Sequence, residues 1–221
     1  MKITKYSHSC VAVEESGKRL LFDPGAFVFI EGKMQPEEIG AVDVVLITHT
    51  HPDHYFPEAL KKLYALKSFV LLVSADTAAT MEADGLGIPT QVLQPGNTIV
   101  VEGFTIHGFD AKHETIPMAC PHNMGYKIND VLYHPGDSYV VPGDLGRVQV
   151  LMLPNGGPWA TTPQTVQFAE IIKPTLVVPI HDGMHKDFWL ERLNASMDGW
   201  MKERGIECKI LGMGEHVEHN A

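Results

Sequence analysis

The chain has 221 residues, of which 44% are hydrophobic and 20% charged, a composition typical of a globular protein with a buried core. It carries 27 acidic against 17 basic residues, a net charge of −10, so we expect neither nucleic acid nor an anionic membrane as a partner. We see no apolar run of about 20 residues that would span a membrane, and no signal peptide. Three cysteines without a CxxC pair indicate a reducing compartment, which we take to be the cytoplasm.

The first part of the chain predicts short strands followed by helices. Residues 24–40 form a loop that contains Gly and Pro, and the apolar run 43–48 suits a strand buried on both faces. A helix is expected to begin at Pro57, because proline is favoured in the first helical turn. The predicted strands are 2–6, 10–14, 18–23, 43–48 and 69–73, and the predicted helices are 57–66 and 75–84.

Strands recur at short spacing between residues 90 and 135, which is typical of an antiparallel meander, and the last third alternates strands and helices. The predicted strands are 91–93, 98–101, 104–109, 124–128, 131–134, 148–153, 175–180 and 207–211, with helices at 163–172 and 186–204. Two series of strands, each followed by helices, predict one domain over residues 1–221, with two packed sheets and helices outside.

Four potential metal ligands lie within six residues directly after the apolar run 43–48: His49, His51, Asp53 and His54. Imidazoles suit zinc, iron and related ions, and a carboxylate adds a harder ligand. In an extended chain His49 and His51 point the same way and can reach one ion, whereas Asp53 and His54 turn toward a second. A polar loop without function is the alternative, but packing gives no reason for such a density of histidine.

Further ligands are needed, because two neighbouring ions sit about 3.5–4 Å apart and share a bridging ligand. His113, Asp137 and His181 each follow a predicted strand. Taken singly, a His or Asp at a strand end is more often a cap or a hydrogen-bonded turn residue than a metal ligand. Taken together with the first four residues, they predict a site for two divalent cations.

These motifs, in this order, resemble the metallo-β-lactamase fold superfamily, whose defining run is HxHxDH after a buried strand. The segments Tyr6-Ser-His8-Ser9, Phe22-Asp23-Pro24 and Tyr133-His-Pro-Gly-Asp137-Ser138 resemble its branch of L-ascorbate-6-phosphate lactonase-like metal-dependent hydrolases. The resemblance extends from His8 to about Gly212. It implies an α/β fold, an αββα sandwich of two mixed β-sheets with helices on the outer faces and the metals at one edge.

The resemblance also implies a ligand set. His49, His51 and His113 would hold one metal, Asp53, His54 and His181 the other, and Asp137 would bridge them. Asp53 and Asp137 are the candidate catalytic residues, and the sequence leaves open whether Asp53 also moves a proton.

Other residues are candidates for support or for substrate contact. Asp23 either orients a ligating imidazole or is a turn residue before Pro24. His8 either contacts substrate or donates a proton at the pocket rim, or is a satisfied buried histidine. His134 is expected to support the site, and His185 to line the cleft. Trp159 is interpreted as an aromatic packed at the surface, with a cap over the substrate as the alternative.

The expected function is that of a hydrolase in which a hydroxide held by two metals attacks a small ester, lactone or phosphoester. Zinc is the expected metal, with manganese, iron or nickel as alternatives. A phosphodiesterase and a non-catalytic metal-binding or sensing protein are the competing interpretations. None of the three cysteines lies where a β-lactamase has its metal-binding cysteine, so antibiotic hydrolysis is not expected. A small-molecule substrate and association into a homo-oligomer complete the expectations.

Overall fold

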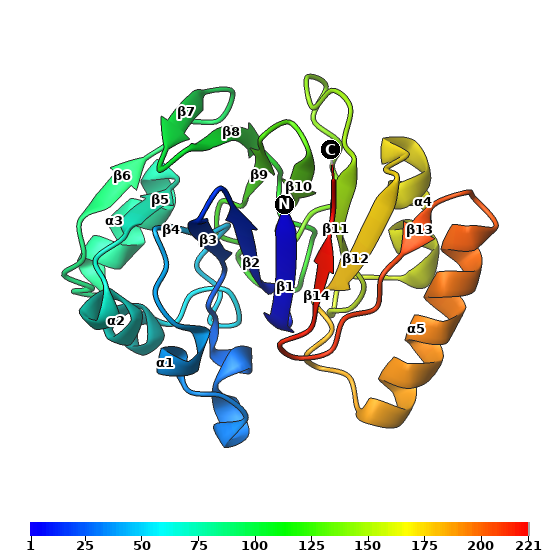
Figure 1. The fold of residues 1–221 in the computed structure, drawn as a ribbon, viewed down its shortest axis with the longest axis horizontal. Helices are drawn as coiled ribbons and strands as arrows, with labels where there is room; N and C mark the ends of the chain where they lie inside the picture. The colour runs from blue at the N-terminus through cyan, green and yellow to red at the C-terminus, as the bar shows by residue number, and fades with distance from the viewer. Residues whose placement is uncertain (221) are drawn as a thin grey trace.

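Two seven-stranded sheets face each other in the computed structural model, which describes residues 1–220 (Figure 1). The strands of the first sheet are β1 (Lys2–Ser7), β2 (Cys10–Glu15), β3 (Lys18–Phe22), β4 (Val44–Leu46), β5 (Val70–Val73), β6 (Thr90–Val92) and β14 (His216–Glu218). Their order is β14-β1-β2-β3-β4-β5-β6. Pairing is antiparallel from β14 to β3 and parallel from β3 to β6, so the sheet is mixed.

The second sheet repeats this mixed pattern. Its strands are β7 (Thr98–Val101), β8 (Phe104–Asp110), β9 (Met124–Ile128), β10 (Leu132–His134), β11 (Val150–Pro154), β12 (Leu176–Ile180) and β13 (Glu207–Cys208). They are arranged in the order β13-β12-β11-β10-β9-β8-β7. Pairing is antiparallel from β7 to β10 and parallel from β10 to β13.

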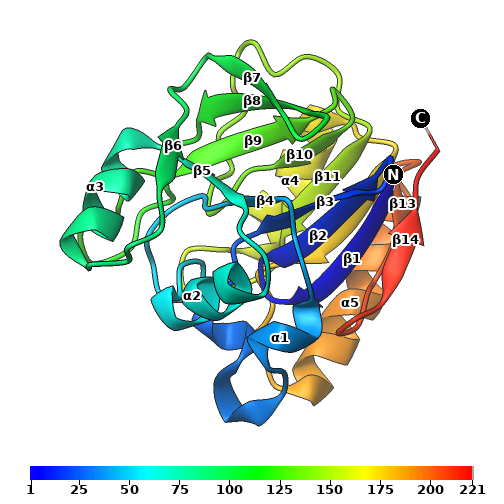
Figure 2. The same ribbon diagram turned by 60° about the vertical axis from the view of Figure 1, so that its left-hand side comes forward.

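Helices cover the outer faces of both sheets, as Figures 1 and 2 show. Three lie against the first sheet, α1 (Pro36–Ile39), α2 (Pro57–Leu66) and α3 (Ala75–Ala83), and two lie against the second, α4 (Thr162–Ile172) and α5 (Asp187–Lys202). The predicted αββα sandwich is therefore confirmed. Among the described residues, none of the helices is both long and apolar enough to cross a membrane.

Side-chain alternation along the strands produces this layering. In β2, Val11 and Val13 join the core between the sheets, whereas Cys10 and Ala12 join the cluster beneath the helices. Successive residues of a strand point to opposite faces, so a strand covered on both sides is apolar at nearly every position. A third cluster packs the second sheet against α4 and α5, with Phe168 and Met197 fully or nearly fully buried in it.

Three sequence predictions are wrong in part. The loop 24–40 contains the 3-10 turns Ala26–Val28 and Ile30–Gly32 as well as α1. The predicted meander does not include β6, which pairs in parallel with β5 in the first sheet, because its connection through α3 returns it to that sheet. The last predicted strand, 207–211, is reduced to Glu207–Cys208, and the chain continues into β14, which pairs with β1.

Candidate metal centre

The candidate ligands gather just beyond the ends of strands. His8 follows β1, and the histidine-rich loop follows β4. His113, Asp137 and His181 lie beyond β8, β10 and β12. Both sheets thus deliver polar side chains to the same edge of the sandwich, where loops can expose them without disturbing the apolar core.

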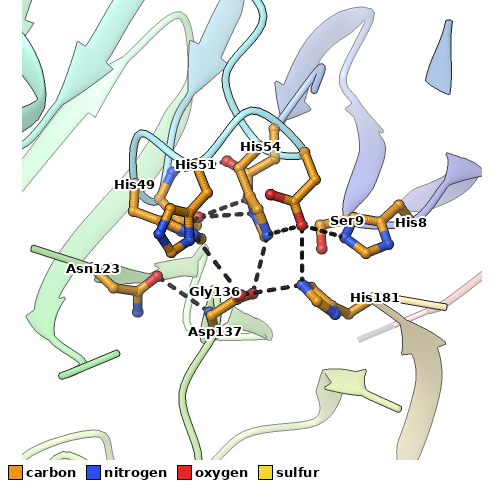
Figure 3. Close-up of polar contacts among 12 residues, drawn as sticks. His8, Ser9, His49, His51, His54, Asn123, Gly136, Asp137 and His181 are labelled. Carbon is orange, nitrogen blue, oxygen red and sulfur yellow. Dashed lines mark hydrogen bonds and ion pairs between the residues drawn. The ribbon is translucent and has the colours of Figure 1, made fainter. Parts of the chain in front are cut away.

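Eight side chains form two adjacent groups, and within each group the potential ligand atoms lie within 4.8 Å of one another. The first group is His49, His51, His113 and Asp137, and the second is His8, Asp53, His54 and His181. Figure 3 shows Asp137 facing the histidines of the β4 loop and His181. All seven residues expected to bind metal are therefore brought together, and His8 joins them.

Asp137 reaches both groups. Its Oδ1 lies 3.1 Å from Nε2 of His54, and its Oδ2 lies 3.1 Å from Nε2 of His181 and 3.5 Å from Nε2 of His113. Asp137 is buried, with 3% of its side chain exposed, so these contacts are shielded from water. Its position between the groups is the one that a bridging ligand requires.

The loop that carries Asp137 is held from several sides. The backbone N–H of Asp137 donates to Oδ1 of Asn123 at 3.2 Å, and Nε1 of Trp159 donates to Oδ2 of Asp137 at 3.1 Å. Gly136 has φ of +62°, and a Cβ there would lie 2.0 Å from Oδ1 of Asn123. Only glycine allows this close approach of the backbone to the amide.

Three imidazoles direct their Nε2 atoms inward because their Nδ1–H groups donate outward. His54 donates to Oδ2 of Asp23 at 2.8 Å, His113 to the carbonyl of Glu114 at 2.6 Å, and His181 to the carbonyl of Gly156 at 2.8 Å. A hydrogen bond of this kind sets the tautomer and orientation of a metal-binding histidine.

The inward-facing atoms lack hydrogen-bond partners. Nε2 of His54, Nε2 of His181 and Oδ1 of Asp137 are buried and make no hydrogen bond of acceptable geometry among the described residues, although the two nitrogens lie 3.1 Å from carboxylate oxygens of Asp137. Buried polar atoms without partners are costly, and most proteins avoid them. In the first group, Nδ1 of His51 lies 3.0 Å from Nε2 of His49 and 3.2 Å from Nε2 of His113. Nitrogen lone pairs at these distances repel unless a proton or cation lies between them, so the arrangement fits a bound metal.

Asp23 connects the two groups through Thr48. The Thr48 hydroxyl donates to Oδ2 of Asp23 at 2.7 Å, and its backbone N–H donates to Oδ1 at 2.8 Å. The hydroxyl oxygen then accepts from Nδ1 of His49 at 3.1 Å. Asp23 is fully buried and also accepts from His54, so it orients one imidazole of each group, directly or through Thr48.

His8 offers Asp53 a proton rather than a lone pair. The backbone N–H of Gly183 donates to Nδ1 of His8 at 3.1 Å, so the proton of the neutral ring is on Nε2. That Nε2 donates to Oδ2 of Asp53 at 3.0 Å. Burial, followed by the neighbouring His181, lowers the pKa of His8 to about 4, which keeps the ring neutral.

Acid and base groups in the site shift one another's pKa. Burial raises the pKa of Asp137, but His54 and His181 outweigh it and hold this pKa well below its usual range. Burial lowers the pKa of His181, but Asp137 and Asp53 raise it to about 9. The carboxylates thus stabilise positive charge at the centre, whether it comes from protons or from metal ions.

Several site residues have unusual backbone conformations. His8, Asp23 and His181 have φ of 52°, 42° and 60°, in the left-handed region that L-residues seldom adopt. The backbone N–H of His181 also donates to the carbonyl of His8 at 3.0 Å, which ties the two loops together. Strain of this kind persists only where the surroundings impose it, and it often marks functional sites.

The remaining candidates lie outside the two groups. Nδ1 of His134 accepts from the N–H of Gly136 at 3.1 Å, so this buried ring supports the Asp137 loop. His185 lies against Gly156, since a Cβ on Gly156 would be 2.6 Å from its Nε2. It is not among the described residues that line the cavity over the site. The interpretation of Trp159 as a surface aromatic is wrong, because its side chain is 8% exposed and binds Asp137.

Residues 2–181 match the family model described as the Beta-lactamase superfamily domain, and the chain belongs to this family. Among curated relatives, Protein Rv0786c of Mycobacterium tuberculosis is 32% identical over 197 residues, covering 83% of this chain and 85% of the relative. The UPF0173 metal-dependent hydrolase NEQ378 of Nanoarchaeum equitans is 27% identical over 99% of this chain and 100% of its own length. Family and relatives together class the chain as a metal-dependent hydrolase of the metallo-β-lactamase superfamily.

Solved structures show the same fold. Igni18, a metallo hydrolase from Ignicoccus hospitalis, has a TM-score of 0.77 at 21% identity and covers 98% of this chain and 97% of its own. The isothiocyanate hydrolase from Delia radicum gut bacteria has a TM-score of 0.70 at 19% identity, with both chains covered completely.

Proposed function

We propose that the chain holds two divalent cations and hydrolyses a small ester, lactone or phosphoester. The first cation would be bound by His49, His51 and His113, the second by Asp53, His54 and His181, with Asp137 bridging. The observation that carries this proposal is the placement of the Asp137 carboxylate, whose oxygens lie 3.1 Å from Nε2 of His54 in the second group and 3.5 Å from Nε2 of His113 in the first. The buried ring nitrogens without partners support it.

The donor set suits zinc, and manganese, iron and nickel accept similar sets of imidazole and carboxylate ligands. When bound, two such cations supply a water acidic enough to act as hydroxide at neutral pH and a Lewis acid for the substrate oxygen. No serine or cysteine nucleophile is then required.

Asp53 and Asp137 have different environments, which gives them different roles. The side chain of Asp137 is 3% exposed and is fixed by Trp159, so it positions the centre. The side chain of Asp53 is 18% exposed and lines the cavity, so it can take up a proton from water and deliver it to the leaving group. His8 keeps the Asp53 carboxylate oriented for this transfer through the hydrogen bond from its Nε2.

The test is a substrate panel with defined metals. Metal-free protein is reloaded with Zn²⁺, Mn²⁺, Fe²⁺ or Ni²⁺ and assayed on model esters, lactones, phosphodiesters and a sugar-phosphate lactone. His51→Ala and Asp137→Ala should abolish metal-dependent turnover while the circular dichroism spectrum stays native. His216→Ala is the matched control, because this exposed histidine lies in β14, outside both groups.

The panel also separates the alternatives. Turnover of the sugar-phosphate lactone would favour the L-ascorbate-6-phosphate lactonase-like branch, and turnover of phosphodiesters alone would favour a phosphodiesterase. Full activity of Asp137→Ala would refute the proposed site. Stoichiometric metal binding without turnover of any substrate would favour a metal sensor.

A further inference from the structure

A cavity of about 410 Å³ opens over the candidate metal centre. Its lining includes His51, Asp53, His113, Asp137 and His181, so a molecule bound there meets both groups of ligands. The volume falls within the range of about 300–1,000 Å³ that is usual for small-molecule sites.

The remaining lining is apolar. It consists mainly of Phe27, Ile116, Met118, Pro158, Trp159 and Met184. Met118 is 67% exposed and Met184 46% exposed, so both lie where the cavity meets solvent. Methionine side chains are flexible and polarisable, and they adapt to apolar molecules of different shape.

Basic side chains that could bind an anionic substrate are absent from the described lining of this cavity, so only the two proposed cations would attract such a substrate. Neither Lys nor Arg occurs among the cavity-lining side chains of the described chain, and the only acidic ones are Asp53 and Asp137. Phosphate groups are usually recognised by Arg, Lys or a helix N-terminus. Lys112, one residue before His113 in the sequence, is exposed and lines a neighbouring cavity instead.

Trp159 joins the apolar lining to the catalytic groups. Its indole N–H donates to Asp137, and its ring centroid lies 5.3 Å from that of His181. An apolar substrate in contact with this ring therefore lies beside Asp137 and His181, two of the proposed metal ligands.

We propose that the substrate is an uncharged, apolar carboxylic ester or lactone, bound through contacts with Phe27, Met118 and Met184, and not a phosphorylated molecule. This inference rests on the hydrolytic function proposed above. In the reaction the bond between the acyl carbon and the leaving oxygen breaks, and the oxygen of water bonds to the acyl carbon. One proton of the water passes to the leaving oxygen, and the other is released as the acid ionises.

The first test measures kcat/KM of the metal-loaded protein on p-nitrophenyl esters from acetate to hexanoate. The kcat/KM should rise by up to about fourfold per added methylene, because the transfer free energy of one buried methylene corresponds to a factor of about four. Met184→Ser should reduce this gain per methylene by half or more. Met213→Ser is the control, since Met213 is 42% exposed and is absent from the cavity lining. A flat or falling series, unchanged by Met184→Ser, would overturn the inference.

The second test measures binding without turnover. Metal-free protein labelled with [¹³C-methyl]methionine is titrated with hexanamide and with hexyl phosphate, which share a chain but differ in charge. Hexanamide should shift the methyl signals of Met118 and Met184 but not that of Met213, at concentrations at least tenfold below those at which hexyl phosphate acts. Tighter binding of hexyl phosphate, weakened by Lys112→Ala, would contradict the inference. If hexanamide binds as expected but no ester is hydrolysed, the hydrolytic function fails and the preference for an uncharged apolar ligand is upheld.

Discussion

The carboxylate of Asp23 accepts a hydrogen bond of 2.8 Å from Nδ1 of His54, and both side chains are fully buried. This contact leaves Nε2 of His54 directed at Asp137, 3.1 Å away. Asp23, which is not a proposed metal ligand, therefore fixes the orientation of His54, which is one. This relationship can be tested.

Asp23→Ala should weaken metal binding by about 10- to 100-fold, because partners that orient a metal-binding histidine typically contribute that much. Competition with a chelating indicator measures the change in affinity. Asp43→Ala is the matched control, since Asp43 is a largely buried aspartate that pairs with Lys67 rather than with a histidine. Equal metal affinities for Asp23→Ala and the unmodified protein would show that this hydrogen bond is dispensable.

The variants His8→Gln and His8→Leu should differ in turnover, because only glutamine retains a side-chain N–H that can donate to Asp53. We expect His8→Leu to lower turnover about 10- to 100-fold and His8→Gln to recover most of this loss. The absorption spectrum of the Co²⁺-substituted protein is the second measurement, and it should not change in either variant if His8 is not a metal ligand. If His8 were a ligand instead, both variants would lose activity equally and would change the Co²⁺ spectrum in the same way.

Metal uptake should release protons near neutral pH. The pKa of His181 lies at about 9 in the metal-free protein, above its ordinary value of 6.5, so its ring is protonated at pH 7.5. A metal ion that takes up Nε2 must displace this proton. Titration of metal-free protein with Zn²⁺ in weak buffer should acidify the solution at pH 7.5, and less so above pH 9.

The raised pKa of His181 also affects the stability of the metal-free protein. A histidine whose pKa is raised by folding stabilises the folded state fully below about pH 6.5. This stabilisation is lost as the pH rises through about 9. The melting temperature of chelated protein should therefore fall between pH 7 and 9.5. A constant melting temperature, together with metal uptake that releases no proton, would contradict the raised pKa of His181.

Lys5 and Asp182 form a buried ion pair beside the centre, with 2.5 Å between Nζ and Oδ2. Their side chains are 6% and 7% exposed. Lys5→Met leaves the Asp182 carboxylate buried without a counter-charge and should cost about 3–5 kcal/mol in the free energy of unfolding. The double variant Lys5→Met/Asp182→Leu should be more stable than the single one. Urea denaturation measures both, and a loss below about 1 kcal/mol in Lys5→Met would show that the pair is solvated.

Local patterns in the sequence predict the layered fold and several of its elements. α2 spans Pro57–Leu66 as expected, because proline suits the first helical turn and apolar residues repeat along one face. The apolar run before His49 forms a buried strand, although only Val44–Leu46 are paired as β4. β14 was missed because three residues without a hydrophobic pattern form it, and its pairing with β1 joins opposite ends of the chain.

The candidate ligands were recognisable from their residue types and order, but their supporting residues were not. Thr48 and Asn123 are common residues whose roles depend on hydrogen bonds to Asp23 and Asp137, far away in sequence. Trp159 lies in a glycine-containing loop, a setting typical of exposed residues, but it is buried in contact with Tyr139 and His181. Such contacts arise from tertiary structure, which no local pattern encodes.

Elemental analysis of protein purified without chelators is the most direct test of the two-metal centre. We expect two equivalents of divalent transition metal per chain, or two on titration of the metal-free protein, and fewer than two in Asp137→Ala. Protein that contains no transition metal and takes up none on titration would contradict the account.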